Sequence, residues 1–306
     1  MTLLTEEDLE KYIDAGRIAC LIAKDLEHYV KPNLKILELA HYIENRIREL
    51  GGEPAFPVNI SINNIAAHYT PLPDDTTIIP SEAVVKIDIG VHIEGYIADT
   101  AVTISLSDKF TPLIESVKQA LEKALLYIAP GKRFNEVGAI IEKTVKDYGY
   151  RPIYNLSGHS IDRYVIHAGE TIPNFNDRLN FGKFQKGKVY AVEPFATNGV
   201  GFVIETSTTT IYALKFNPKK IRALSKDTYT LYTEIYNTRR TLPFAIRWYI
   251  DRISKTRINN ILYELRNNNL LIPYPVLIEK SNGVVTQFEH TVLIDNKGNV
   301  IITTEC

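Results

Sequence analysis

The sequence lacks the marks of a secreted, a membrane-spanning or a disulfide-rich protein. Its 306 residues include two cysteines, Cys20 and Cys306, which are too few for a disulfide framework and do not have the spacing of zinc ligands. No apolar run approaches the ~18 residues that a membrane span needs. The start, MTLLTEEDLE, is acidic where a signal peptide is basic and then apolar. We therefore expect no disulfide framework, no membrane contact and a cytoplasmic location, in a reducing compartment.

The composition is that of an ordinary globular protein, but the charge is unevenly distributed. Hydrophobic residues make up 45% and charged residues 23% of the chain, and a chain of 306 residues can bury a sizeable core. The net charge is −1. Residues 215–266 hold twelve Lys and Arg against four Asp and Glu, so this segment carries +8 and the rest of the chain −9.

Two stretches about a hundred residues apart repeat one order of predicted elements. Thr5 and Asp8 resemble a capping box, and the first two predicted helices end at Gly51-Gly52, before a predicted β-hairpin. The pattern of two helices and then β-structure returns from Thr111-Pro112. Two repeats are too few for a solenoid. We therefore expect an α+β protein with two pseudo-symmetric helix-helix-β halves and a site between their sheets.

The predicted hairpin carries two aspartates in an apolar string, KIDIGVHIEGYIADT. If Glu94-Gly95 forms a two-residue turn, Asp88 faces Ala101 and Asp99 faces Gly90 on the neighbouring strand. Both carboxylates then project from one face as diagonal neighbours, about 7–8 Å apart at the backbone. Such a pair repels unless a cation lies between the two groups, and Gly90 leaves room for one. The ordinary alternative is a solvated strand face.

Three other side chains weaken that alternative. Glu193 ends the apolar strand VYAV, Glu289 lies on the polar face of VVTQFEHTVLI, and His159 follows a glycine. A carboxylate among apolar neighbours is costly unless it is paired or coordinated. Four carboxylates and one imidazole suit Mn, Fe or Co better than structural Zn, and their charge balances two divalent cations. Two such ions sharing a hydroxide can attack a peptide carbonyl at neutral pH.

Five strings, in this order, resemble methionine aminopeptidase of type 2, a member of the M24 metallopeptidases, in its archaeal form. They are AAHYTP (66–71), KIDIGVHIEGYIADTA (86–101), NLSGHSIDRYVIHAG (155–169), VEPFAT (192–197) and TQFEHT (286–291). The resemblance covers essentially the whole chain. It implies the pita-bread fold, one catalytic domain over residues 1–306 and a type 2 helical insertion at 206–272.

The resemblance also implies roles for individual residues. Five residues would bind two divalent ions, chosen among Co, Mn, Fe and Zn, with Asp99 and Glu289 as bridging ligands; they are Asp88, Asp99, His159, Glu193 and Glu289. Three residues would be catalytic: Glu193 as the proton carrier, and His68 and His167 as partners of the scissile amide and the developing oxyanion. His68 and His167 would bind the substrate together with the walls of the methionine pocket, which are Phe56, Ile166 and Tyr274.

The implied reaction is removal of the N-terminal methionine from nascent polypeptides with a small second residue. A hydroxide on the dinuclear metal centre would attack the first peptide bond. Two alternatives remain open. One is a pita-bread peptidase specific for X-Pro substrates, a prolidase or aminopeptidase P. The other is a non-enzymatic pita-bread protein that binds RNA or proteins.

The basic segment 215–266 suggests a partner as well. Its predicted elements are a helix capped by Ser225, a helix that begins at Pro243 and a helix through Ile258. A subdomain of this charge could contact ribosomal RNA through phosphates, although ordinary solvated helix faces would explain the charge too. We expect nascent polypeptide N-termini as partners, a possible ribosome contact, no DNA and no membrane, and a monomer.

Overall fold

The computed structural model describes residues 3–250 and 252–306. In the first half, two helices precede a sheet that is built around the predicted hairpin. The elements are α1 (Glu6–Tyr29), α2 (Ile36–Glu49), β1 (Glu53–Pro54), β2 (Asn59–Ile62), β3 (Ile65–Ala67), β4 (Val84–Ile93) and β5 (Tyr96–Ser105). The expected capping box of α1 is present, because the Thr5 side chain accepts from the Asp8 N–H and Asp8 bonds back.

The second half repeats the pattern after a short 3-10 helix, η1 (Asp108–Phe110). Its elements are α3 (Thr111–Tyr127), α4 (Phe134–Asp147), β6 (Arg151–Pro152), β7 (Ser157–Ile161), β8 (Thr171–Pro173), β9 (Lys188–Val192), β10 (Phe195–Thr197), β14 (Val285–Gln287), β15 (His290–Ile294) and β16 (Val300–Ile302). One apolar core packs α1 and α2 against β2, β4 and β5, and a second packs α3 and α4 against β9, β10 and β15. The predicted α+β architecture with two related halves is confirmed.

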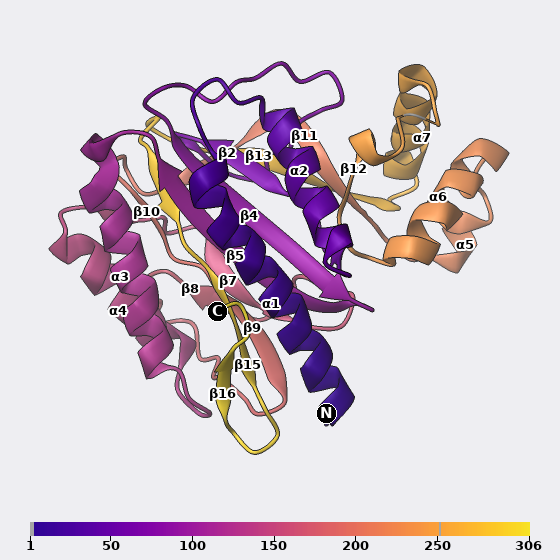
Figure 1. Ribbon diagram of the computed structural model, residues 1–306. Helices are drawn as coiled ribbons and strands as arrows, with labels where there is room; N and C mark the ends of the chain where they lie inside the picture. Colours follow the sequence, from indigo (N-terminus) through magenta and orange to yellow (C-terminus); the bar gives the residue numbers. More distant parts are fainter. Residues whose placement is uncertain (1–2, 251) are drawn as a thin grey trace.

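Helices are inserted between two long strands of the second half and stand at one edge of the molecule, drawn in orange in Figure 1. The elements of this region are β11 (Val203–Leu214), α5 (Pro218–Ile221), α6 (Lys226–Arg239), β12 (Phe244–Ala245), η2 (Ile246–Trp248), α7 (Lys255–Asn267) and β13 (Leu271–Glu279). β11 and β13 pair antiparallel, so the insertion leaves and returns at neighbouring strands. We call residues 215–270 the helical insertion.

One predicted element of the helical insertion is wrong. Ser225 caps α6, as expected, but no α-helix begins at Pro243. Phe244 and Ala245 instead form β12, which pairs with Tyr212 and Ile211 of β11. A proline before apolar residues is typical of a helix start, and here the pairing with an existing strand outweighs that local preference.

The chain end also differs from the expectation. Cys20 of α1 and Cys306 form a disulfide, with their Cα atoms 6.1 Å apart, and the expectation of no disulfide framework in a reducing compartment did not foresee this single bond. β16 pairs with β15 and returns the last residues to α1, where Figure 1 places the C-terminus. The two cysteines are 286 positions apart in the sequence, and no local pattern indicated that they meet. Within the described residues, no helix is both long and apolar enough to cross a membrane.

Candidate metal and substrate site

The β4–β5 hairpin positions the two aspartates as expected. Glu94 and Gly95 form its tip with φ values of +50° and +89°, the left-handed conformation that a two-residue turn requires. The register pairs Asp88 with Ala101 and Gly90 with Asp99. The prediction that both carboxylates lie on one face of the hairpin is therefore confirmed.

The space beside Gly90 holds a side chain rather than a cation. A Cβ at Gly90 would lie 2.3 Å from Cε1 of Phe56, so the glycine is required by the close approach of this ring. The sequence-based interpretation that Gly90 makes room for a cation is wrong. The aromatic ring comes from the segment before β2, and no local pattern in the hairpin indicated it.

The second half brings two glutamates to the same place. Glu193 follows β9 and Glu289 precedes β15, and these strands pair antiparallel. β5 of the first half crosses over to them, because Ala101 forms a β-bridge with Glu289 and the Asp99 N–H donates to Oγ1 of Thr291 at 2.7 Å. Three strands from the two halves, β5, β9 and β15, thus hold three carboxylates together.

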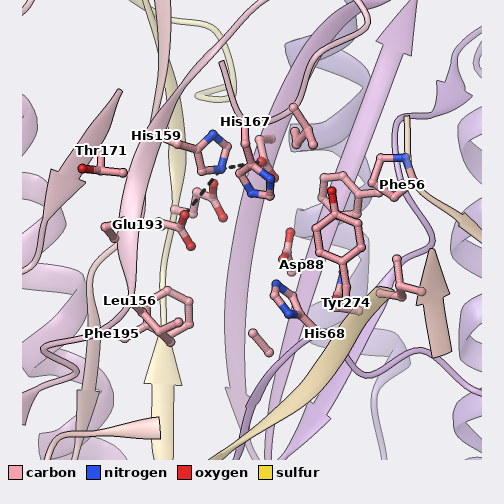
Figure 2. A pocket seen from close by; sticks show the side chains of 18 of the residues that line it. Phe56, His68, Asp88, Leu156, His159, His167, Thr171, Glu193, Phe195 and Tyr274 are labelled. Carbon is pink, nitrogen blue, oxygen red and sulfur yellow. Dashed lines mark ion pairs between the residues drawn. The ribbon is translucent and has the colours of Figure 1, made fainter. Parts of the chain in front are cut away.

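His159, on β7, faces these carboxylates. Its Nε2 lies 3.5 Å from Oε1 of Glu193 and 3.7 Å from Oδ2 of Asp99, and Figure 2 shows both contacts as dashed lines. Its Nδ1 lies 3.4 Å from the Ser160 carbonyl, which can only accept, so Nδ1 carries the proton. Burial, helped by His167, holds the pKa of His159 well below its usual value. A neutral imidazole therefore presents a lone pair to the carboxylates.

The electrostatics of this cluster are unfavourable without a cation. Burial raises the pKa of Asp88 to about 7. Burial and then the neighbouring carboxylates raise the pKa values of Asp99, Glu193 and Glu289 well above the usual range. Among the described residues, three buried carboxylate oxygens have no hydrogen-bond partner; they are Oδ1 of Asp88, Oδ1 of Asp99 and Oε1 of Glu289. The ligand atoms of Asp99, His159 and Glu289 lie within 4.8 Å of one another, a grouping suited to a metal ion.

Gln287 is a member of the site that the sequence analysis did not assign to it. Its Nε2 donates to Oε2 of Glu289 at 3.3 Å and lies 3.5 Å from Oε2 of Glu193. This amide therefore orients two of the proposed ligands. The available signal was its place two residues before Glu289, on the same face of the strand.

The carboxylate cluster forms one wall of a cavity of about 340 Å³. All ten residues that the sequence analysis assigned to the site line this cavity, and Figure 2 shows Phe56, His68 and Tyr274 across from His159 and Glu193. The wall also includes residues that were not predicted, among them Asn59, Leu156, Phe195 and Pro243. The ten predicted residues are Phe56, His68, Asp88, Asp99, His159, Ile166, His167, Glu193, Tyr274 and Glu289.

Two histidines stand beside the cluster. The rings of His159 and His167 are 4.4 Å apart, and the rings of His68 and Tyr274 are 5.6 Å apart. His68 has a φ of +64°, a strained conformation for a residue with a side chain. Its Nδ1 lies 3.2 Å from the Pro275 carbonyl, and burial and the nearby His167 lower its pKa to about 4. His68 is therefore neutral, with Nε2 left as an acceptor for an N–H group.

Comparisons with known proteins agree with this geometry. The model of metallopeptidase family M24 matches residues 10–296. The methionine aminopeptidase of Pyrococcus horikoshii is 44% identical over 298 residues, which are 97% of this chain and 100% of the relative. The methionine aminopeptidase of Saccharolobus solfataricus is 44% identical over 300 residues, which are 98% of each chain.

Solved structures show the same fold at lower identity. A thermophilic Arx1 superposes with a TM-score of 0.85 at 19% identity, covering 98% of this chain and 91% of that one. The methionine aminopeptidase of Thermotoga maritima superposes with a TM-score of 0.71 at 19% identity over both full chains. A prolidase from Pyrococcus furiosus reaches 0.61 at 18% identity, covering 99% of this chain and 65% of the prolidase. The predicted pita-bread fold is therefore confirmed.

Proposed function

Because the chain belongs to metallopeptidase family M24 and, within it, to the methionine aminopeptidases, we propose that it is a type 2 enzyme with a dinuclear metal centre. Its substrates would be nascent polypeptides whose second residue is small. The observation that carries the proposal is the convergence of four carboxylates and one unprotonated imidazole nitrogen on one wall of a cavity. The helical insertion between β11 and β13 supports the type 2 assignment.

The residues present fit a pair of divalent ions. Within the described part of the chain, three buried carboxylate oxygens have no hydrogen-bond partner. The Nε2 lone pair of His159 faces two carboxylates. Groups of this kind can coordinate a cation. Four carboxylates balance two divalent charges, and the oxygen-rich set suits Mn, Fe, Co or Zn. The residues that would hold the ions are Asp88, Asp99, His159, Glu193 and Glu289.

The chemistry that such ions supply when bound is polarisation of a carbonyl and generation of a water-derived nucleophile at neutral pH. Glu193, which lines the cavity beside His159, would take a proton from the nucleophile and return it to the leaving amine. His68 and His167 would bond the scissile amide and the developing oxyanion. Phe56, Ile166 and Tyr274 would enclose the methionine side chain.

The test is a peptidase assay on metal-reconstituted enzyme. We expect cleavage of Met-Ala-Ser, little cleavage of a peptide with a bulky second residue, and none of Ala-Pro peptides. Elemental analysis should give two ions per active chain. The variant Glu193→Gln should lose peptidase activity while it still folds. Preferential cleavage before proline would favour a prolidase-like enzyme, and an inactive, metal-free chain would favour a non-enzymatic protein.

The helical insertion supports a second proposal, a contact with the ribosome. Lys219, Arg222 and Lys226 are exposed around α5 and the start of α6, which gives a small basic surface suited to phosphates. Wild-type protein should sediment with ribosomes at low salt and dissociate at high salt. Changing these three residues to Glu should abolish the association. If wild-type protein does not sediment with ribosomes at low salt, the proposed contact is wrong.

Localisation and assembly follow from the same proposal. An enzyme that acts on nascent chains belongs in the cytoplasm, and we expect it to be a monomer, which size-exclusion chromatography with light scattering would check. The Cys20–Cys306 disulfide does not exclude this location, since disulfides are rare in intracellular proteins but do occur in some of them.

A further inference from the structure

Arg239 lies where the helical insertion meets the catalytic halves. It is the last residue of α6, and 7% of its surface is exposed. Its Nε donates to the Pro243 carbonyl at 3.1 Å, and its Nη2 donates to the carbonyls of Pro54 at 2.7 Å and Ala55 at 3.2 Å. One guanidinium therefore joins a segment of the first half to a segment of the insertion.

The guanidinium is bound by neutral groups. Within residues 3–250 and 252–306, no carboxylate forms an ion pair with Arg239; its guanidinium carbon lies 4.4 Å from the centre of the Trp248 ring. Burial lowers its pKa to about 10, so it keeps its charge at neutral pH. Burying a cation is costly, and here three carbonyls and an aromatic face offset that cost. All three of these carbonyls belong to the two segments that Arg239 joins.

Both segments form walls of the cavity. Phe56 directly follows Ala55, and Phe56 and Pro243 both line the cavity. The Phe56 ring is pressed against Gly90 on its other side. The position of this ring is therefore set from one side by the hairpin and from the other by the backbone that Arg239 holds.

The residues after Arg239 extend the same connection to a third wall. Oγ1 of Thr241 donates to the Tyr164 carbonyl at 2.8 Å, in the loop that carries Ile166. Leu242 is fully buried and belongs to the same apolar cluster as Phe56 and Ile166. The stretch 239–243, which we call the brace, thus contacts the supports of two proposed pocket walls and supplies a third wall itself.

We propose that Arg239 is a positioning residue for the methionine side-chain pocket, and that through the brace the helical insertion sets the specificity for the first residue of the substrate. This inference rests on the proposed function, because it assumes that Phe56 and Ile166 enclose that side chain. Arg239 itself would not touch the substrate or the proposed metal ligands.

The proposal predicts which kinetic constant changes. Pocket walls contact the methionine side chain equally before and during the reaction, so their displacement weakens binding without altering the chemical step. A variant that is merely unstable loses active molecules, which lowers the apparent kcat and leaves KM unchanged. Displacement of the pocket walls therefore raises KM, whereas instability lowers the apparent kcat.

The experiment compares Arg239→Met and Arg239→Lys with wild type, all metal-reconstituted, on Met-Ala-Ser and Leu-Ala-Ser. For Arg239→Met we expect KM for Met-Ala-Ser to rise about tenfold or more, and kcat to stay within about threefold. The Ki of free L-methionine should rise in parallel, and the preference for Met over Leu should fall about tenfold. Arg239→Lys should give intermediate values, because lysine keeps the charge but not the planar fork.

Two further variants keep the test decisive if Arg239→Met does not fold. Thr241→Val removes an exposed hydroxyl that bonds the Tyr164 carbonyl, and should raise KM by a smaller factor, about two- to fivefold. Arg252→Ala removes a charge of the same kind from the exposed surface, where Arg252 pairs with Glu234, and should leave all constants unchanged.

Each outcome supports or overturns a stated claim. A KM that rises in both brace variants and not in Arg252→Ala supports the inference. Brace variants with wild-type KM, Ki and Met preference, or with a fall in kcat alone, overturn it. A wild type that does not prefer Met over Leu overturns the proposed function instead, so the two failures are distinguishable.

Discussion

Replacing one proposed ligand should stabilise the protein when no metal is bound. The carboxyl of Asp88 has a pKa of about 7, against 3.8 for a free aspartate, because it is buried. An acid whose pKa is raised in the folded state contributes full stability below pH 3.8, and that contribution is lost as the pH rises through 7. Asn at position 88 does not ionise, so Asp88→Asn does not lose this stability as the pH rises.

The size of the effect follows from the shift. At ~1.4 kcal/mol for each pKa unit, metal-free Asp88→Asn should be more stable than wild type by about 4 kcal/mol at pH 8 and by about 2 kcal/mol at pH 5. These are upper figures, since Asp88 faces a cavity that water can enter. Divalent metal should close the gap at pH 8, because ligand at about a thousandfold excess over Kd stabilises wild type by about 4 kcal/mol and the variant has lost a ligand.

Urea denaturation of EDTA-treated protein at pH 5 and pH 8, with and without Mn²⁺, measures the difference in unfolding free energy between Asp88→Asn and wild type under all four conditions. Asp25→Asn is the control, because Asp25 is exposed on α1, and it should match wild type throughout. The reasoning is refuted if metal-free Asp88→Asn is no more stable than wild type at pH 8, or if the gap does not change with pH.

Three further predictions concern single residues. His167→Ala should lower kcat by about 10²–10³-fold at unchanged metal content, shown by steady-state kinetics with elemental analysis; loss of metal would make His167 a ligand instead. Cys306→Ser opens a loop spanning 286 residues and should lower the free energy of unfolding, measured by urea denaturation, by up to about 5 kcal/mol. A thiol titration that finds two free thiols in the native wild type would contradict the disulfide. Arg247→Met strands the buried carboxylate of Glu44, its ion-pair partner, and should cost about 3–5 kcal/mol in urea denaturation, which Glu44→Gln in the same chain should largely restore.

The hairpin shows what the sequence could predict. A two-residue turn and the alternation of side chains in a strand fix which residues face each other, so Asp88 and Asp99 could be placed on one face from their numbers alone. Their meeting with His159, Glu193 and Glu289 depends on how β5 crosses to β15, and the sequence suggested it only through the repeated halves and the resemblance to a known family.

The failures share a physical cause, which is contact between distant segments. Phe56 occupies the space beside Gly90 although 34 residues separate them. Phe244 joins a strand because β11 already offers an open edge, although the preceding proline favours a helix start. Cys20 and Cys306 meet because β16 returns the chain end to α1. Local patterns carry no information about such partners.

The charge of the helical insertion illustrates the same point for function. The excess of basic residues in 215–266 suggested an outward-facing partner, but Arg239 and Arg247 are buried, and Arg252, Lys255 and Arg257 are paired with acidic side chains. The two buried arginines both point toward the catalytic halves.

Arg247 donates to Oγ1 of Thr70 and to the Pro71 carbonyl, at the end of the segment that begins with His68. The Thr70 N–H bonds Oγ1 of Thr210, which bonds the His68 carbonyl in turn, so the strained backbone of His68 is held through this network. Arg239 holds the Phe56 wall in the same way. Two buried arginines of the insertion therefore support two walls of the cavity. A ribosome contact would have to use the few basic side chains that are exposed around α5.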